Sequence, residues 1–166
     1  MASAKTCPTC GRPLDAHDQH FRFNLPDPVL NAPAREHTPG TWMSHADART
    51  SVMMQVPKVG PFMRALLPVR LTGGYTVTFG VWLAVHPDDL QHIFAVWWES
   101  DYIRLVVHGW LANSLPVWDL IATPVRAVVR DPEQTPYCAD SPNEQLAAVL
   151  SDEWPHDLVL GAVSDR

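Results

Sequence analysis

Residues 73–85 decide the fold of this chain: Gly73-Gly74-Tyr75-Thr76-Val77-Thr78-Phe79-Gly80-Val81-Trp82-Leu83-Ala84-Val85. Alternate residues of a strand point to opposite faces, and here one alternating set, from Tyr75 to Val85, is wholly apolar. The other set is mixed and consists of Thr76, Thr78, Gly80, Trp82 and Ala84. This pattern predicts a central antiparallel strand with the core on one side only. Because Gly73 and Gly74 tolerate positive φ angles, we expect a tight hairpin that brings a preceding strand back along it.

The composition is typical of one globular domain. The chain has 166 residues, of which 46% are hydrophobic and 18% charged, enough for a core without disulfides. A net charge of -6 with only 12 basic residues argues against a nucleic-acid partner, which requires a local excess of Lys and Arg. We expect no membrane association, because the sequence shows neither a signal segment nor an apolar run near the roughly 20 residues of a membrane span. Three cysteines do not form a disulfide framework, so we expect a cytoplasmic location.

Residues 1–20 are predicted to form a metal knuckle and its lead-in. Cys7-Pro8-Thr9-Cys10-Gly11 has the C-x-x-C spacing that lets two thiolates reach one metal, and it supplies half of a structural zinc site. A complete site needs two more ligands, for which His17 and His20 are the first candidates and Cys138 is an alternative. The other interpretation is a pair of free cytosolic thiols. A redox motif is disfavoured, because no helix pattern follows the second cysteine.

Residues 21–166 are predicted to form a single α+β domain with a mainly antiparallel sheet. A long loop rich in Pro, Ala and His occupies residues 24–48. We expect strands near residues 21–23, 51–56, 63–71, 75–85, 102–111 and 125–130, and a loop at 131–137.

Two to three helices are expected to pack on one face of this sheet. The first begins at His86-Pro87-Asp88-Asp89 and ends at Trp97-Trp98, with an apolar stripe of Leu90, Ile93, Phe94 and Trp97. The second begins at residues 141–144 and runs to Leu150. A third is expected to be capped by Ser151-Asp152-Glu153 and to run to about Val163.

The mixed face of the sheet is the predicted place for a site. If the helices cover the apolar face, then this face stays partly open, and an aromatic cleft with a few polar groups is the usual form of a small-molecule site. The expected ligand-binding residues are Trp82, Arg104, Trp110, Trp118 and Arg126. His108 is the candidate general acid–base, and Asp119 is the candidate group that orients it. The alternative is that these residues pack under the long loop and the arginines form a solvated rim.

Several short motifs resemble those of one bacterial family. They are Cys7-x-x-Cys10-Gly11, Phe21-x-Phe23 with Pro26-Asp27, Gly80-Val81-Trp82, and Gly109-Trp110-Leu111 with Leu115-Pro116. On these motifs the chain resembles domain of unknown function 2199, over most of its length. Members of that family tend to place a histidine shortly after the C-x-x-C-G, where this chain has Leu14, and a Tyr-Pro and a Thr after the Leu-Pro, where this chain has Trp118-Asp119-Leu120. The family supplies no established reaction, so the resemblance implies a fold rather than a function.

Two functional hypotheses follow from the sequence. The first is a non-catalytic binding module that engages a partner protein or a small aromatic or apolar ligand through a Trp-rich sheet face. Seven tryptophans and the absence of a catalytic motif favour it. The alternative is a small cofactor-independent enzyme, of the isomerase, cyclase or hydrolase type, that uses His108.

Overall fold

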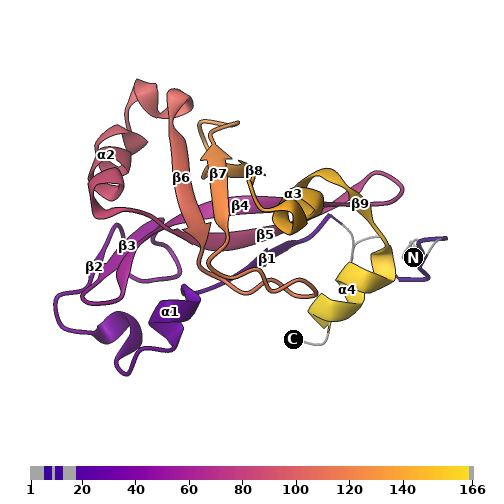
Figure 1. The fold of residues 1–166 in the computed structure, drawn as a ribbon, viewed down its shortest axis with the longest axis horizontal. Coiled ribbons are helices and arrows are strands. Elements are labelled where there is room, and N and C mark those ends of the chain that lie inside the picture. The colour runs from indigo at the N-terminus through magenta and orange to yellow at the C-terminus, as the bar shows by residue number, and fades with distance from the viewer. Residues whose placement is uncertain (1–5, 9, 13–17, 165–166) are drawn as a thin grey trace, which may run out of the picture.

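A long antiparallel hairpin forms the centre of the structure (Figure 1). The computed structural model of the chain describes residues 6–8, 10–12 and 18–164. In it β4 (Gly60–Leu71) and β5 (Tyr75–Ala84) pair from Phe62 opposite Ala84 to Leu71 opposite Tyr75. Gly73 and Gly74 have φ angles of 86° and 88°, which are the left-handed values that the turn requires and that favour glycine. The hairpin predicted from residues 73–85 is therefore present.

Five strands of the sheet close on one another. β5 pairs with β6 (Val106–Leu111), β6 with β7 (Pro124–Val128), and β7 with β8 (Tyr137–Asp140), all antiparallel. A single parallel bridge between Leu66 and Tyr137 then joins β8 back to β4. Since β4 also pairs with β5, the five strands form a closed circuit with an inside and an outside.

Four short strands extend this closed sheet. β3 (Met53–Val56) and β2 (Trp42–Met43) continue antiparallel from β4. β1 (His20–Arg22) lies parallel to β5, and β9 (Glu153–Trp154) lies parallel to β4. The sheet is thus mainly antiparallel.

The described residues form four α-helices: α1 (Asp27–Leu30), α2 (Pro87–Trp97), α3 (Glu144–Ser151) and α4 (His156–Ser164). Two 3-10 helices, η2 (Arg35–His37) and η3 (Ser100–Arg104), complete the set. The His86 ring caps α2 by accepting the N–H of Asp88, and the Asn143 side chain caps α3. Figure 1 shows α4 and β9 near the hairpin turn, whereas α2 lies at the other end of the hairpin. The α+β class is confirmed, with α1 as a further short helix inside the region expected to be loop.

The larger hydrophobic core fills the inside of the closed sheet. It contains the apolar face of β5 from Val77 to Leu83, the next residue outside the strand, Val85, and the inward residues of β4, β6, β7 and β8. Helices α2, α3 and α4 add the buried side chains of Leu90, Ile93, Leu146, Val149, Val159, Leu160 and Val163. This distribution matches the apolar face predicted from the sequence.

A second, smaller core covers part of the opposite face of β5. It contains Leu25, Val29, Ala48, Met54, Val56, Phe62, Trp82 and Ala112. Trp82 is 0% exposed, and the Arg64 guanidinium lies 4.2 Å from the centre of its ring. That guanidinium donates four hydrogen bonds of 2.8 to 3.3 Å to the carbonyl groups of Phe23, Asn24, Ala48 and Ser51. The long loop is thereby fixed over the part of the sheet that holds Trp82, which we expected to stay open.

Three segments differ in secondary structure from the expectation, and several strand ends shift by a few residues; β4, for example, begins at Gly60 instead of residue 63. Residues 102–104, expected to begin a strand, form the end of η3, because Tyr102 turns inward and its hydroxyl donates to the Gln134 carbonyl oxygen at 2.5 Å. Residues 137–140 form β8, because closure of the sheet gives them β7 and β4 as partners. The expected loop ended at Tyr137, and no strand was predicted at residues 138–140. Glu153 and Trp154 form β9 by pairing with Arg70 and Leu71 of β4. The prediction of a helix cap at residues 151–153 was therefore wrong, and the last helix begins at His156.

No helix among the described residues combines the length and the apolar character needed to cross a membrane.

Replacement of Trp82 by alanine is expected to lower the free energy of unfolding by about 3–5 kcal/mol, because it empties the centre of the second core. Trp98→Ala is the matched control: Trp98 is 56% exposed, and its loss should change the free energy by about 0.5 kcal/mol or less. Denaturant unfolding of both variants measures the difference. Equal midpoints for the two variants would contradict the assignment of Trp82 to a packed core.

Candidate functional site

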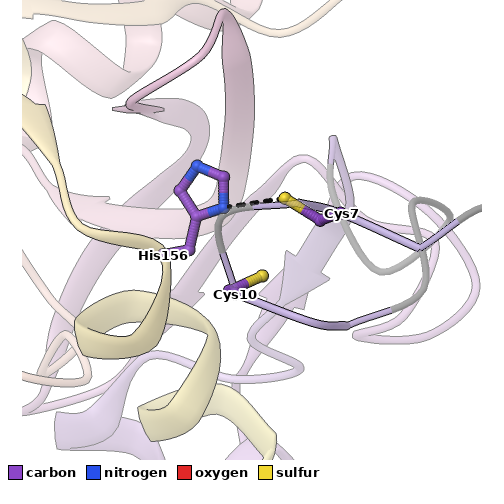
Figure 2. A group of neighbouring side chains, drawn as sticks. All are labelled: Cys7, Cys10 and His156. Atoms are coloured by element: carbon purple, nitrogen blue, oxygen red, sulfur yellow. Dashed lines mark hydrogen bonds between the residues drawn. The ribbon is translucent and has the colours of Figure 1, made fainter.

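Three side chains that are potential metal ligands converge where the N-terminal turn meets α4 (Figure 2). They are Cys7, Cys10 and His156, and their ligand atoms all lie within 4.8 Å of one another. The Cys7 Sγ is 3.5 Å from the His156 Nδ1. Cys7 and His156 are each 2% exposed, and Cys10 is half-buried.

The turn that carries the two cysteines is held by its own backbone. The N–H of Gly11 donates to the Cys7 carbonyl at 2.9 Å, and the N–H of Cys7 donates to the Arg12 carbonyl at 2.8 Å. Gly11 has a φ of 75°, which a residue with a side chain adopts only with strain. The glycine after C-x-x-C therefore lets the chain turn back so that both thiols face α4.

His156 is oriented by its other ring nitrogen. Its Nε2 bonds to the Thr72 carbonyl oxygen at the hairpin turn, and the ring packs edge-on against Tyr75 with 5.6 Å between centroids. Since a carbonyl only accepts, Nε2 carries the proton, and the Nδ1 lone pair faces the two sulfurs. A backbone carbonyl that fixes the tautomer in this way is a regular partner of metal-binding histidines.

Arg12 connects the same turn to α4. Its guanidinium forms an ion pair with Asp157 in the first turn of the helix. Partial burial by itself would raise the pKa of the Cys10 thiol. Hydrogen bonds from the Arg12 backbone and side chain and from Cys7, with the Arg12 charge, outweigh it and lower the pKa below its usual value.

The distance between the Cys7 Sγ and the His156 Nδ1 fits a shared metal. Bonds of about 2.3 Å to sulfur and about 2.0 Å to nitrogen, at a tetrahedral angle, separate the two atoms by roughly 3.5 Å. The Cys7–His156 distance has this value, which also suits a hydrogen bond between thiol and imidazole. The three side chains lie close enough to bind a metal ion.

The structure brings together two of the four predicted metal ligands. Cys7 and Cys10 belong to the cluster, and His17 lies outside the described residues. His20 is exposed on β1 opposite Thr78, away from the cluster. Cys138, the alternative, is 1% exposed inside the larger core.

His156 was missed by the sequence analysis. It lies 149 positions from Cys7, so no local spacing connects the two residues. The only sequence signal was its place directly after Pro155, near a helix start.

Three residues of the predicted cleft share a hollow on the outer side of the closed sheet. His108, Trp110 and Arg126 line it, with a volume of about 560 Å³. His108 lies opposite Arg126, and Arg126 lies opposite Asp140 on the next strand. The Arg126 Nε and Nη2 donate to the Asp140 carboxylate at 2.6 to 3.0 Å. These hydrogen bonds, and to a smaller extent the nearby positive charges, hold the pKa of Asp140 below its usual value.

The other predicted residues lie elsewhere. Trp82 is in the second core, and Arg104 is exposed at the end of η3. Trp118 packs against Trp154, with 5.0 Å between ring centroids. Asp119 is exposed in a tight turn and accepts the N–H of Ile121 at 3.4 Å. Among the described residues no hydrogen bond joins Asp119 to His108, and the carboxylate in the hollow is Asp140.

The structure also shows an exposed aromatic cluster that the sequence analysis did not anticipate. The ring centroid of Phe94 lies 5.4 Å from that of Trp42 in β2 and 5.1 Å from that of Trp98, and both contacts are edge-to-face. The ring centroids of His45 and Trp98 are 6.4 Å apart. Trp42, Phe94 and Trp98 are 38%, 45% and 56% exposed. We call these four residues the aromatic surface. Phe94 was expected to lie on the buried apolar stripe of this helix, and that prediction was wrong. Helix α2 packs on the core through Leu90 and Ile93, which leaves the Phe94 side chain exposed.

Residues 6–150 match the family described as an uncharacterized protein conserved in bacteria, DUF2199. The match covers most of the chain, and the protein belongs to this family. It includes Cys7 and Cys10 and ends before His156. No curated protein and no solved structure matches the chain.

The Cys138 thiol is expected to be unreactive in the folded protein. Burial raises its pKa to about 12, despite the opposing effect of the Arg130 charge, so hardly any thiolate forms at pH 8. In a Cys7→Ser/Cys10→Ser double variant, Ellman's reagent should react with this last thiol only after denaturation. Rapid reaction under native conditions would contradict the burial of Cys138.

Proposed function

We propose that the protein is a cytoplasmic binding module that holds a partner protein on its aromatic surface. The observation that carries the proposal is the packing of Phe94 against both Trp42 and Trp98 while each of the three rings remains more than a third exposed. Clustered exposed apolar area is unfavourable in water, and aromatic side chains dominate the binding energy of protein interfaces. Trp42 comes from β2, Phe94 from α2 and Trp98 from the C-cap of α2, so two separate parts of the fold hold the cluster.

The catalytic alternative has less support. His108 lines the hollow, and the carboxylate in that lining, Asp140, is engaged by two nitrogen atoms of Arg126. A general base needs a group that orients its ring, and Asp119 is in a different turn. The hollow therefore lacks the oriented acid–base pair that an active site of this type needs.

The proposed metal at Cys7, Cys10 and His156 is a structural Zn²⁺. Two thiolates and one imidazole are the ligand types that favour zinc over magnesium or calcium. Zinc bound there would join the N-terminal turn to α4 and to the hairpin turn through Thr72. Cys7, Cys10 and Cys138 form no disulfide, which agrees with a reducing compartment such as the cytoplasm.

Replacement of Trp98 by alanine tests the aromatic surface. A partner captured by the wild-type protein from a lysate of its own bacterium should be lost from Trp98→Ala and kept by Trp110→Ala, a similarly exposed tryptophan outside the surface. With the purified partner, we expect Kd to rise by about 30-fold or more, the effect of an interface hot spot of about 2 kcal/mol. Equal binding by the two variants would remove the aromatic surface from the proposal.

Native mass spectrometry tests the metal. Protein purified without chelator should carry one zinc ion, and Cys10→Ser and His156→Ala should both lose it, because each removes one of the three ligands. His20→Ala is the control and should keep the ion, and His17→Ala shows whether the fourth ligand is that histidine. A metal-free wild-type protein, or zinc retained by His156→Ala, would contradict the assignment.

A further inference from the structure

A second pocket lies on the outer side of the closed sheet, between β1, β5 and β4. Its volume is about 260 Å³, just below the usual range for a drug-sized ligand. Basic side chains from two strands line it, namely His20 and Arg22 of β1 and Arg64 of β4. The polar residues Gln134 and Thr135, from the loop before β8, also line the pocket.

A glycine in the middle strand makes room for this pocket. Gly80 of β5 lies opposite Arg22 on one side and opposite Leu66 on the other. A Cβ atom at Gly80 would lie 3.1 Å from the Arg22 Cγ, so the stem of that arginine rests directly on the glycine. A larger residue here would displace Arg22 and fill the floor.

Arg64 brings a buried positive charge to the pocket. It is 3% exposed, and its four hydrogen bonds go to backbone carbonyls, which leaves one of its five N–H groups without a bond to any described residue. Within the described part of the chain no carboxylate forms an ion pair with it. Burial, and to a smaller extent the nearby charge of Arg22, lowers the pKa of Arg64 to about 9. The Arg64 guanidinium therefore stays protonated at neutral pH. The carbonyl dipoles hold the guanidinium in place but supply no net negative charge.

The acidic residues of the adjoining loop do not compensate this charge. Asp131 and Glu133 are absent from the lining of the pocket, and the Asp131 carboxylate accepts the N–H of Glu133 at 2.9 Å. Two arginines therefore share one small pocket without a counter-ion among the described residues.

We propose that this pocket binds a small oxyanion, a carboxylate or a phosphate group, through Arg22 and Arg64. Guanidinium groups bind both kinds of anion with short, charge-assisted hydrogen bonds. An anion would relieve the repulsion between the two arginines, and Gln134 and Thr135 would supply further donors. The pocket is distinct from the aromatic surface, and this inference does not rest on the proposed function.

Calorimetric titration of the full chain with inorganic phosphate, and separately with acetate, tests the proposal at constant ionic strength in chloride. We expect saturable binding of one anion per chain for at least one of the two probes, and the better probe identifies the kind of oxyanion. Arg22→Gln keeps the stem over Gly80 but removes the charge, and should weaken binding by about tenfold or more. Gly80→Ala should weaken it by a similar factor, because the added Cβ displaces Arg22.

Arg104→Gln is the matched control, since Arg104 is an exposed arginine that does not line the pocket. It should bind the anion as the wild type does, and so should Trp98→Ala, which alters only the aromatic surface. Lack of saturable binding of both probes to the wild type up to about 10 mM would overturn the proposal. Equal affinities of the wild type, Arg22→Gln and Gly80→Ala would overturn it as well.

Discussion

The structure depends on one constraint, which is that β5 must be covered on both of its faces. Its inward face is apolar and belongs to the core of the closed sheet. Its outward face carries Trp82, a side chain too large and too apolar to leave in water at the centre of a sheet. The long loop provides the cover. Loops carry backbone carbonyl groups that need partners when they are buried, and Arg64 and Asn113 supply donors to those of residues 23–25, 48 and 51.

This arrangement separates the outer side of the sheet into regions with different chemistry. The loop covers the end of the hairpin that holds Trp82, and next to it the aromatic surface joins β2 to α2. Farther along β5, the glycine at position 80 leaves a pocket that the loop does not fill. On β6 and β7 the exposed residues, such as His108 and Arg126, line a wide hollow. One expected cleft is therefore replaced by three surfaces, because a closed sheet curves its outer residues away from each other.

Local patterns were enough to predict the main elements. The alternation in β5, the glycine pair before it and the His86-Pro87 helix start each depend on residues close in sequence, and the structure contains all three. The remaining features depend on distant contacts. β8 is a strand because the sheet closes on it, and Trp82 is buried because a loop from another part of the chain covers it. His156 could not be paired with the cysteines, since it reaches them only after the hairpin turn and α4 have been placed together.

The distance of 149 positions between Cys7 and His156 has a consequence for the newly made chain. At synthesis rates of about 5–20 residues per second, roughly 7–30 seconds pass between the appearance of the two residues. During this time the paired thiols exist without their imidazole partner, and strands β1 to β9 are all translated before His156 appears. They stay as thiols only where the surroundings keep sulfur reduced, so oxidation during translation is the hazard for a cluster whose members come from both ends of the chain.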